Sequence, residues 1–278
     1  MKLSISELAR RPSVITQNRR LVYVIAASVI LLIDLFRRLI SGELLISLLV
    51  GYLWSGLTFG VIVGLAGVGL SLTYDLLGFA NFAHGDYITV SAFTGWGAAY
   101  LIAGAGQYDL GSLFFLGVGG TLYPGDIGIN VANTPGAIIG GLVVAAVAGA
   151  VIAVILDRMI YRSMRESGAI TLLIASVGVA FVLRYLTVYV FTQQSFGLTV
   201  SAQTYDLTVS GGTLSVSVSS LVLVGISVIT MFSVHLMLTR TTLGKAMRAM
   251  GDNRDLARVT GIPAERVIRT TWIVGGAL

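Results

Sequence analysis

The chain has 278 residues, of which 55% are hydrophobic and only 11% are charged, and its mean hydropathy is +0.89. Soluble domains of this length are about 25% charged, so the composition excludes an ordinary soluble fold and indicates a protein solvated by lipid. The net charge of +5 does not indicate a nucleic-acid binder, because the basic residues form short blocks rather than one continuous face.

The N-terminal part, residues 1–40, predicts a cytoplasmic basic arm followed by an extra first transmembrane helix. Five basic residues precede the apolar run 21–36, and Arg37-Arg38 follows it. This order resembles the start of a signal peptide, but no clear cleavage site follows. We therefore interpret the run as a retained helix.

Further apolar segments follow along residues 41–278, and a spanning helix needs about 20 mostly apolar residues. Together they predict an all-α, polytopic transmembrane helical bundle. The expected spans are 45–74, 87–103, 136–156, 169–191 and 218–238, with a seventh that begins near Thr270.

Basic residues in the loops predict the orientation, because cytoplasmic loops of membrane proteins are enriched in Lys and Arg. Segments 1–20, 157–168 and 239–269 hold 15 of the 18 basic residues, whereas 104–135 and 192–217 hold none. The chain is therefore expected to be a multi-pass membrane protein with a cytoplasmic N-terminus. The exceptions to the pattern are Arg37, Arg38 and Arg184.

The outer segment 204–218 alternates apolar and polar residues around Gly211-Gly212, which predicts a small β-hairpin. It either plugs the space between two helices or contacts an extracytoplasmic binding protein.

Glycines concentrate in the spans, and Gly56, Gly60 and Gly64 share one helix face at i+4 spacing. Close helix packing is the interpretation we prefer over a pore-lining role.

The segment 75–86 joins two spans, is polar and contains no Lys or Arg, although a cytoplasmic turn of this chain would be expected to be basic. Two interpretations stay open from physics alone. One is a broken or re-entrant segment, which is tolerated at membrane depth only where protein covers it or it lines a cavity. The other is an ordinary short loop.

Arg184 lies inside a predicted span, where a charge costs at least a few kcal/mol unless it is paired. Its expected partners are Asp75, Asp86 or backbone carbonyls. A structural ion pair is favoured over substrate binding.

The segment 239–269 is punctuated like two short helices. Thr242 is expected to cap the first and Gly251 to end it, while Asp252 or Asn253 caps the second and Gly261 ends it. Apolar side chains, among them Met247, Met250 and Leu256, alternate with basic ones. Docking to a cytoplasmic partner is favoured over a patch for lipid headgroups.

The sequence resembles the permeases of branched-chain amino-acid ABC importers, LivH type, over roughly residues 45–278. Three blocks carry the resemblance. The first runs from Gly56-Leu-Thr-Phe-Gly60 to Asn81-Phe-Ala-His-Gly85. The second pairs Asp157-Arg-Met-Ile-Tyr-Arg162 with Leu173-Ile-Ala-Ser-Val-Gly178. The third is Leu243-Gly-Lys-Ala-Met-Arg-Ala249 through Gly261-Ile262.

The resemblance implies a prokaryotic cell-membrane protein that pairs with a second homologous permease, two cytoplasmic ATPases and an extracytoplasmic binding protein. It also favours the re-entrant interpretation of 78–86. The residues it implies for the substrate path are Asn81, Phe82, His84, Gly85 and Asp86. Those it implies for ATPase coupling are Gly244, Met247, Arg248, Met250, Leu256 and Gly261.

No ATPase site is expected on this chain, because it contains no P-loop motif, and its two histidines, His84 and His235, lie too far apart in sequence to suggest a His-rich metal site. ATP would be used by the partner subunits, and no cofactor or metal is expected on this chain. A urea or amide importer is the alternative function, followed by an ion-coupled secondary transporter. Because the family continues through further spans after residue 277, we expect the chain to be C-terminally incomplete.

Overall fold

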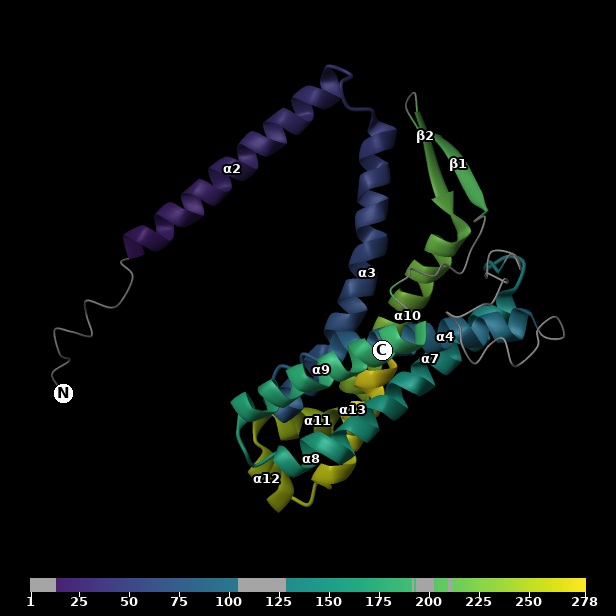
Figure 1. Cartoon of the computed structure of the whole chain (residues 1–278). Helices are drawn as coiled ribbons and strands as arrows, with labels where there is room; N and C mark the ends of the chain where they lie inside the picture. The colour runs from purple at the N-terminus through teal and green to yellow at the C-terminus, as the bar shows by residue number, and fades with distance from the viewer. Residues whose placement is uncertain (1–13, 105–128, 192, 194–202, 210–211) are drawn as a thin grey trace. The chain divides into compact units, whose positions relative to one another are not determined.

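The computed structural model describes residues 14–104, 129–191, 193, 203–209 and 212–278. Within these ranges the chain is helical apart from one two-stranded sheet, which confirms the predicted helical membrane protein (Figure 1). It divides into two compact units, Met1–Trp54 with Asp206–Ser215, and Ser55–Tyr205 with Val216–Leu278. Most of the predicted outer loops, 105–128 and 194–202, lies outside the described residues.

The first unit contains α2 (Val14–Ile40), the start of α3 (Ile46–Leu77) and most of the hairpin formed by β1 (Thr204–Val209) and β2 (Gly212–Ser217). The predicted hairpin is confirmed, and Ser215 Oγ donates to Asp206 Oδ1 across it at 2.5 Å.

The two arginines at the end of α2 are paired with carboxylates close by in the sequence. Asp34 accepts from Arg38 Nε at 2.8 Å and from Arg37 Nη2 at 3.2 Å, and Arg37 also contacts Glu43 at 3.3 Å. These two exceptions to the basic-loop pattern are therefore locally neutralised.

The second unit holds the rest of the molecule, and three of its long helices, α4, α7 and α9, lie next to one another (Figure 1). The helix α4 lies along α7, and α13 packs against α7. The elements are α4 (His84–Ala103), α7 (Pro135–Leu156), the π-helical turn η1 (Asp157–Tyr161), α8 (Arg162–Met164), α9 (Ala169–Phe191), α10 (Val218–Arg240), α11 (Thr242–Asp252), α12 (Arg254–Val259) and α13 (Ala264–Ala277).

Four of the described helices are long and apolar enough to cross a membrane: Ile46–Leu77, Pro135–Met164, Ala169–Phe191 and Val218–Arg240. The predicted spans at 21–36 and 87–103 are helical, as α2 and α4, but fall outside this set. The α4 helix buries polar and small residues, among them Asp86, Ser91 and Gly95, against other helices. A helix covered by protein does not need a continuous apolar surface.

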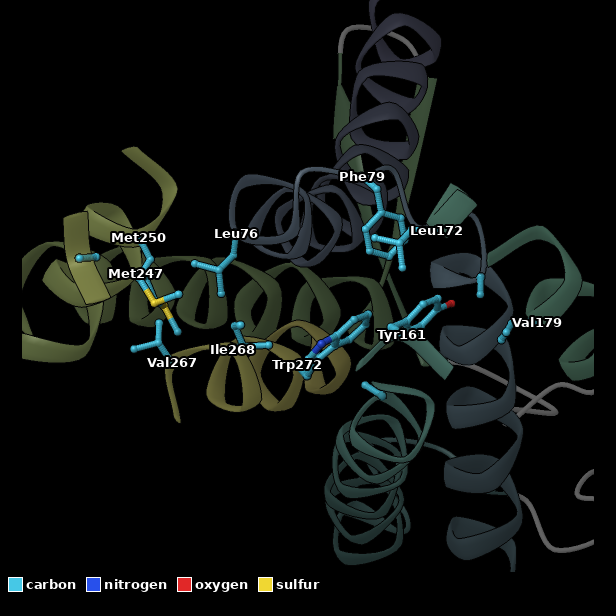
Figure 2. Packing of buried hydrophobic residues seen from close by; sticks show 13 residues of the cluster. Leu76, Phe79, Tyr161, Leu172, Val179, Met247, Met250, Val267, Ile268 and Trp272 are labelled. Carbon is cyan, nitrogen blue, oxygen red and sulfur yellow. The ribbon is translucent and has the colours of Figure 1, made fainter. Parts of the chain in front are cut away.

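The main core of the second unit gathers side chains from widely separated elements (Figure 2). Trp272 of α13 is fully buried, and its ring stacks on that of Tyr161 in η1 with centroids 5.3 Å apart. Phe79 lies against the same tyrosine at 5.4 Å. Because α13 begins at Ala264 rather than near Thr270, its first turns also enter this core through Val267 and Ile268.

Close packing is found at one of the three glycines of the predicted face, Gly64, where a Cβ would lie 3.1 Å from Met231 Cε, and at two further helix crossings. A Cβ on Gly149 of α7 would lie 2.0 Å from the carbonyl oxygen of Gly276, so the two backbones touch. A Cβ on Gly69 of α3 would likewise lie 2.9 Å from the carbonyl oxygen of Gly275. By contrast, Gly56 and Gly60 face open space among the described residues, so packing within this chain does not explain them.

Candidate functional site

A short break separates α3 from α4, and it is the centre of the candidate site. The α3 helix ends at Leu77, Gly78 follows at a φ of +73°, and α4 begins at His84. Glycine adopts this left-handed conformation without the steric cost of a Cβ, so it can turn the chain there. The irregular backbone therefore covers 78–83, and His84, Gly85 and Asp86 already belong to the first turn of α4.

Most of the break is covered by protein rather than solvent. Asn81 is 2% exposed, Ala83 0% and His84 5%, while Phe82 is 57% exposed and Gly85 is also exposed. Of the residues predicted for the substrate path, Asn81, His84 and Asp86 are therefore buried, whereas Phe82 and Gly85 are exposed. Burial of irregular backbone is the condition under which it is tolerated at membrane depth.

Asn81 holds the break together through its side-chain oxygen. Its Oδ1 accepts from Ala83 N at 3.2 Å and from the hydroxyl of Tyr161 at 3.1 Å. Phe82 N donates to Ser176 Oγ of α9 at 3.0 Å. The amide nitrogen of Asn81 is buried and has no hydrogen-bond partner among the described residues. An unpaired buried donor of this kind costs about 1–3 kcal/mol.

His84 ties the start of α4 to the middle of α3. Its Nε2 lies 2.9 Å from the carbonyl oxygen of Ala66, and its Nδ1 contacts the hydroxyl of Tyr87. Gly69 leaves room for this ring, because a Cβ there would come within 3.0 Å of His84 Cε1. The histidine is therefore held by both ring nitrogens, and in the described parts of the chain no cluster of three metal-ligating side chains occurs.

Arg184 of α9 pairs with Asp86 of α4, one of the partners expected from the sequence. Arg184 Nε lies 3.1 Å from Asp86 Oδ1, and the aspartate side chain is 10% exposed while that of the arginine is 61% exposed. The pair links α9 to the first turn after the break. The arginine compensates the negative charge of the Asp86 carboxylate, which is otherwise enclosed by helices.

Sequence reasoning missed a further ion pair, in which both partners are buried. Both oxygens of Asp157 in η1 accept from Arg165 Nη2, at 2.6 and 2.8 Å, and both side chains are 8% exposed. Arg165 Nη1 also donates to Glu265 of α13 at 2.8 Å. A carboxylate inside an otherwise basic segment was the available signal, although its partner cannot be assigned from spacing.

The segment 239–269 contains the two predicted short helices, with small corrections at their ends. Thr241, not Thr242, caps α11, by accepting from Gly244 N at 3.1 Å. The α11 helix continues one residue beyond Gly251 to Asp252. Asn253 caps α12 by accepting from Leu256 N at 2.9 Å.

The apolar face of α11 is turned inward, which corrects the expected docking surface. Met247 is 6% exposed and Met250 is 2% exposed, and Figure 2 shows both beside Leu76 in this chain's own core. They are therefore not available as anchors for a partner. The apolar side chains left outside are Leu256, 61% exposed, and Val259, 85% exposed.

Burial also affects α12, where it lowers the pKa of the Arg254 guanidinium, with Arg258 and Arg165 adding to the effect. The Nε of Arg254 is buried and has no partner among the described residues. Arg248 and Arg258 are exposed.

A cavity of about 480 Å³ lies where α11 meets the last turns of α3. Its lining includes Asp75 and Leu76 of α3 and Met247, Arg248 and Asp252 of α11. A Cβ on Gly251 would lie 3.5 Å from the carbonyl oxygen of Asp75. The α11 helix therefore touches α3 within a few residues of the break.

Comparison with known proteins gives one family and several relatives. The family described as "Branched-chain amino acid transport system / permease component" matches residues 52–278. The high-affinity branched-chain amino acid transport system permease protein LivH of Escherichia coli K12 is 25% identical over 231 residues. LivH of Salmonella typhimurium is 22% identical over 231 residues, and BraD of Pseudomonas aeruginosa is 21% identical over 228. Each alignment covers 81% of this chain and 66% of the relative, just under two thirds. No solved structure matches the chain.

Proposed function

This chain belongs to the branched-chain amino acid transport system permease family, and from that membership we propose that it is the transmembrane subunit of an ATP-driven amino-acid importer. Its solutes would be branched-chain or related small amino acids, because the similar proteins LivH and BraD are named for that transport. A urea or amide importer is the alternative within the same fold.

The break at 78–83 is the proposed place where the substrate path is controlled. It offers buried polar groups, Asn81 and His84, between helices that are otherwise apolar. The free amide donor of Asn81 supports this role. Its desolvation cost would be relieved if the break opened toward a polar solute.

Coupling to ATP hydrolysis is proposed to run through α11. The observation that carries this proposal is that Met247 and Met250 share one core with Leu76 and Phe79, which flank the start of the break. A displacement of α11 by a partner would move α3 and the break directly, since packed cores transmit strain rather than absorb it.

The proposed contact for the partner ATPase is the outer surface of α12 with the adjoining basic side chains. Leu256 and Val259 supply exposed apolar anchors, and Arg248 and Arg258 supply charge around them. Buried apolar anchors usually provide most of the binding energy at an interface, while charges at its edge add little. Two cytoplasmic ATPases, a second homologous permease and an extracytoplasmic binding protein would complete the importer.

The experiment is reconstitution of the importer, with its ATPases, partner permease and binding protein, in liposomes. Uptake of radiolabelled leucine and ATP hydrolysis would be measured with the Leu256→Asp/Val259→Asp variant. We expect uptake and substrate-stimulated hydrolysis to fall at least tenfold, because each change places an unpaired charge in the contact. The permease should keep its thermal stability, since both side chains are exposed.

The matched control is Thr260→Asp, an exposed residue directly after α12. It should leave uptake close to wild type. Full uptake by the Leu256→Asp/Val259→Asp variant would remove α12 from the coupling surface. Leucine uptake that follows an ion gradient without ATP would instead indicate a secondary transporter.

A further inference from the structure

A second cavity, of about 290 Å³, lies between the end of the α7 span and the start of α13. Four arginines line it: Arg158, Arg162, Arg266 and Arg269. The remaining lining residues are Val154, Asp157 and Glu265. Neither the transport path nor the surface proposed for the ATPase uses this cavity.

The two carboxylates in the cavity are already occupied by cations. Asp157 is held by Arg165 through both oxygens. Glu265 Oε1 accepts from Arg165 at 2.8 Å, and its Oε2 lies 3.6 Å from Arg162 Nε. Arg158, Arg266 and Arg269 form no ion pair among the described residues. The cavity therefore keeps an excess of positive charge and unused N–H donors.

The surroundings of the cavity indicate which kind of anion would fit. Val151, Ile155 and Met159 follow one another at i+4 spacing along the outer face of the same helical segment, and they are 50%, 46% and 75% exposed. This apolar stripe leads along a span-length helix, Pro135–Met164, to the level of the arginines. A lipid whose acyl chains lie along this apolar stripe and whose phosphate lies among the arginines would match both the stripe and the cavity.

We propose that this cavity binds the headgroup of an anionic phospholipid at the cytoplasmic end of α7. The guanidinium groups of Arg158 and Arg269 would donate to the phosphodiester oxygens, a pairing that the planar fork of arginine suits well. Basic pockets between helices on the cytoplasmic side recognise headgroups by this chemistry. Bound lipid would bridge α7 and α13.

Native mass spectrometry of the purified chain in a non-ionic maltoside detergent tests the proposal. The probes are dioleoyl phosphatidylglycerol and dioleoyl phosphatidylcholine, which share acyl chains and differ in net charge. We expect the wild-type chain to retain phosphatidylglycerol preferentially. Each Arg→Gln change should weaken that binding about fivefold, so Arg158→Gln/Arg269→Gln should lose about twentyfold or more.

Two further variants separate charge from folding. Arg158→Lys/Arg269→Lys keeps the charge and should keep most of the preference. Arg240→Gln removes an arginine from the end of α10, outside the cavity, and should bind as wild type does. Circular dichroism on every variant would report whether helix content is unchanged.

The remaining outcomes overturn the proposal. Equal retention of both lipids, or an unchanged preference in Arg158→Gln/Arg269→Gln, would exclude a headgroup site here. Displacement of phosphatidylglycerol by inorganic phosphate at equal molar amounts would identify the cavity as a site for free phosphate instead. Loss of the preference in Arg240→Gln to the same degree would show only a general effect of surface charge.

Discussion

Replacement of Asp157 by alanine is the sharpest test of the buried network between η1 and α13. The aspartate is the bidentate partner of Arg165, at 2.6 and 2.8 Å, and both side chains are 8% exposed. Its removal leaves a guanidinium enclosed by protein that has lost two of its three hydrogen bonds. The change therefore leaves a buried charge paired only with the exposed carboxylate of Glu265, rather than merely deleting a contact.

The magnitude follows from the geometry. Breaking a buried ion pair from one side costs about 3–5 kcal/mol. Arg165 keeps its contact to Glu265 at 2.8 Å, on a carboxylate that is 57% exposed, so the lower end of this range applies. At roughly 2–4 °C per kcal/mol for a chain of this size, Asp157→Ala should lower the Tm by about 6–12 °C.

Differential scanning fluorimetry in one detergent provides the assay, because Trp272 reports on the adjoining core through its stacking on Tyr161. The double variant Asp157→Leu/Arg165→Met removes both charges and should recover more than half of the loss, since apolar residues of similar volume replace such pairs at little cost. The control Arg162→Met, whose pair with Glu265 is exposed, should shift the Tm by no more than about 2 °C.

Two results would refute this reasoning. A loss below about 2 °C in Asp157→Ala would mean that solvent reaches the arginine despite its burial. A double variant at least as unstable as the single one would mean that packing volume, not charge, dominates at this position.

Two further predictions concern packing and orientation. Gly149→Ala should lower the Tm by several degrees, because its Cβ would lie 2.0 Å from Gly276 O. The control Gly56→Ala places its methyl group in open space and should leave the Tm unchanged or slightly raised. Equal Tm values for the two variants would exclude the backbone contact at Gly149. A cysteine at position 206 should react with an impermeant maleimide in intact cells, whereas one at position 162 should react only after permeabilisation, and the reverse pattern would invert the topology.

The helices themselves could be predicted because lipid imposes simple rules on sequence. Long, mostly apolar runs predict α3, α7, α9 and α10, and alternation around a Gly pair predicts the hairpin. The three arginines outside the basic loops also have a common explanation. Arg37, Arg38 and Arg184 each meet a carboxylate, so none is an unpaired charge.

The orientation of α11 could not be predicted, because an amphipathic pattern indicates an apolar face but not what covers it. The pattern predicts Met247 and Met250 as anchors for a partner, whereas the structure buries both in a core that they share with Leu76 and Val267 of the same chain. The limits of the break were set by Gly78 and the first turn of α4, which composition does not reveal. Long-range pairs such as Tyr161 with Asn81 depend on tertiary contacts that spacing does not encode.

The small size of α12 has a practical consequence for engineering. Ala257, 3% exposed, and the partly buried Arg254 tie this six-residue helix to the rest of the chain, and Asn253 supplies its cap from outside. A graft of residues 254–259 from a related permease, with arginine kept at 254 and alanine at 257, would exchange the outer surface while leaving the supporting helices in place. Chimeras of this kind would show whether one transmembrane scaffold can be redirected to a different motor subunit.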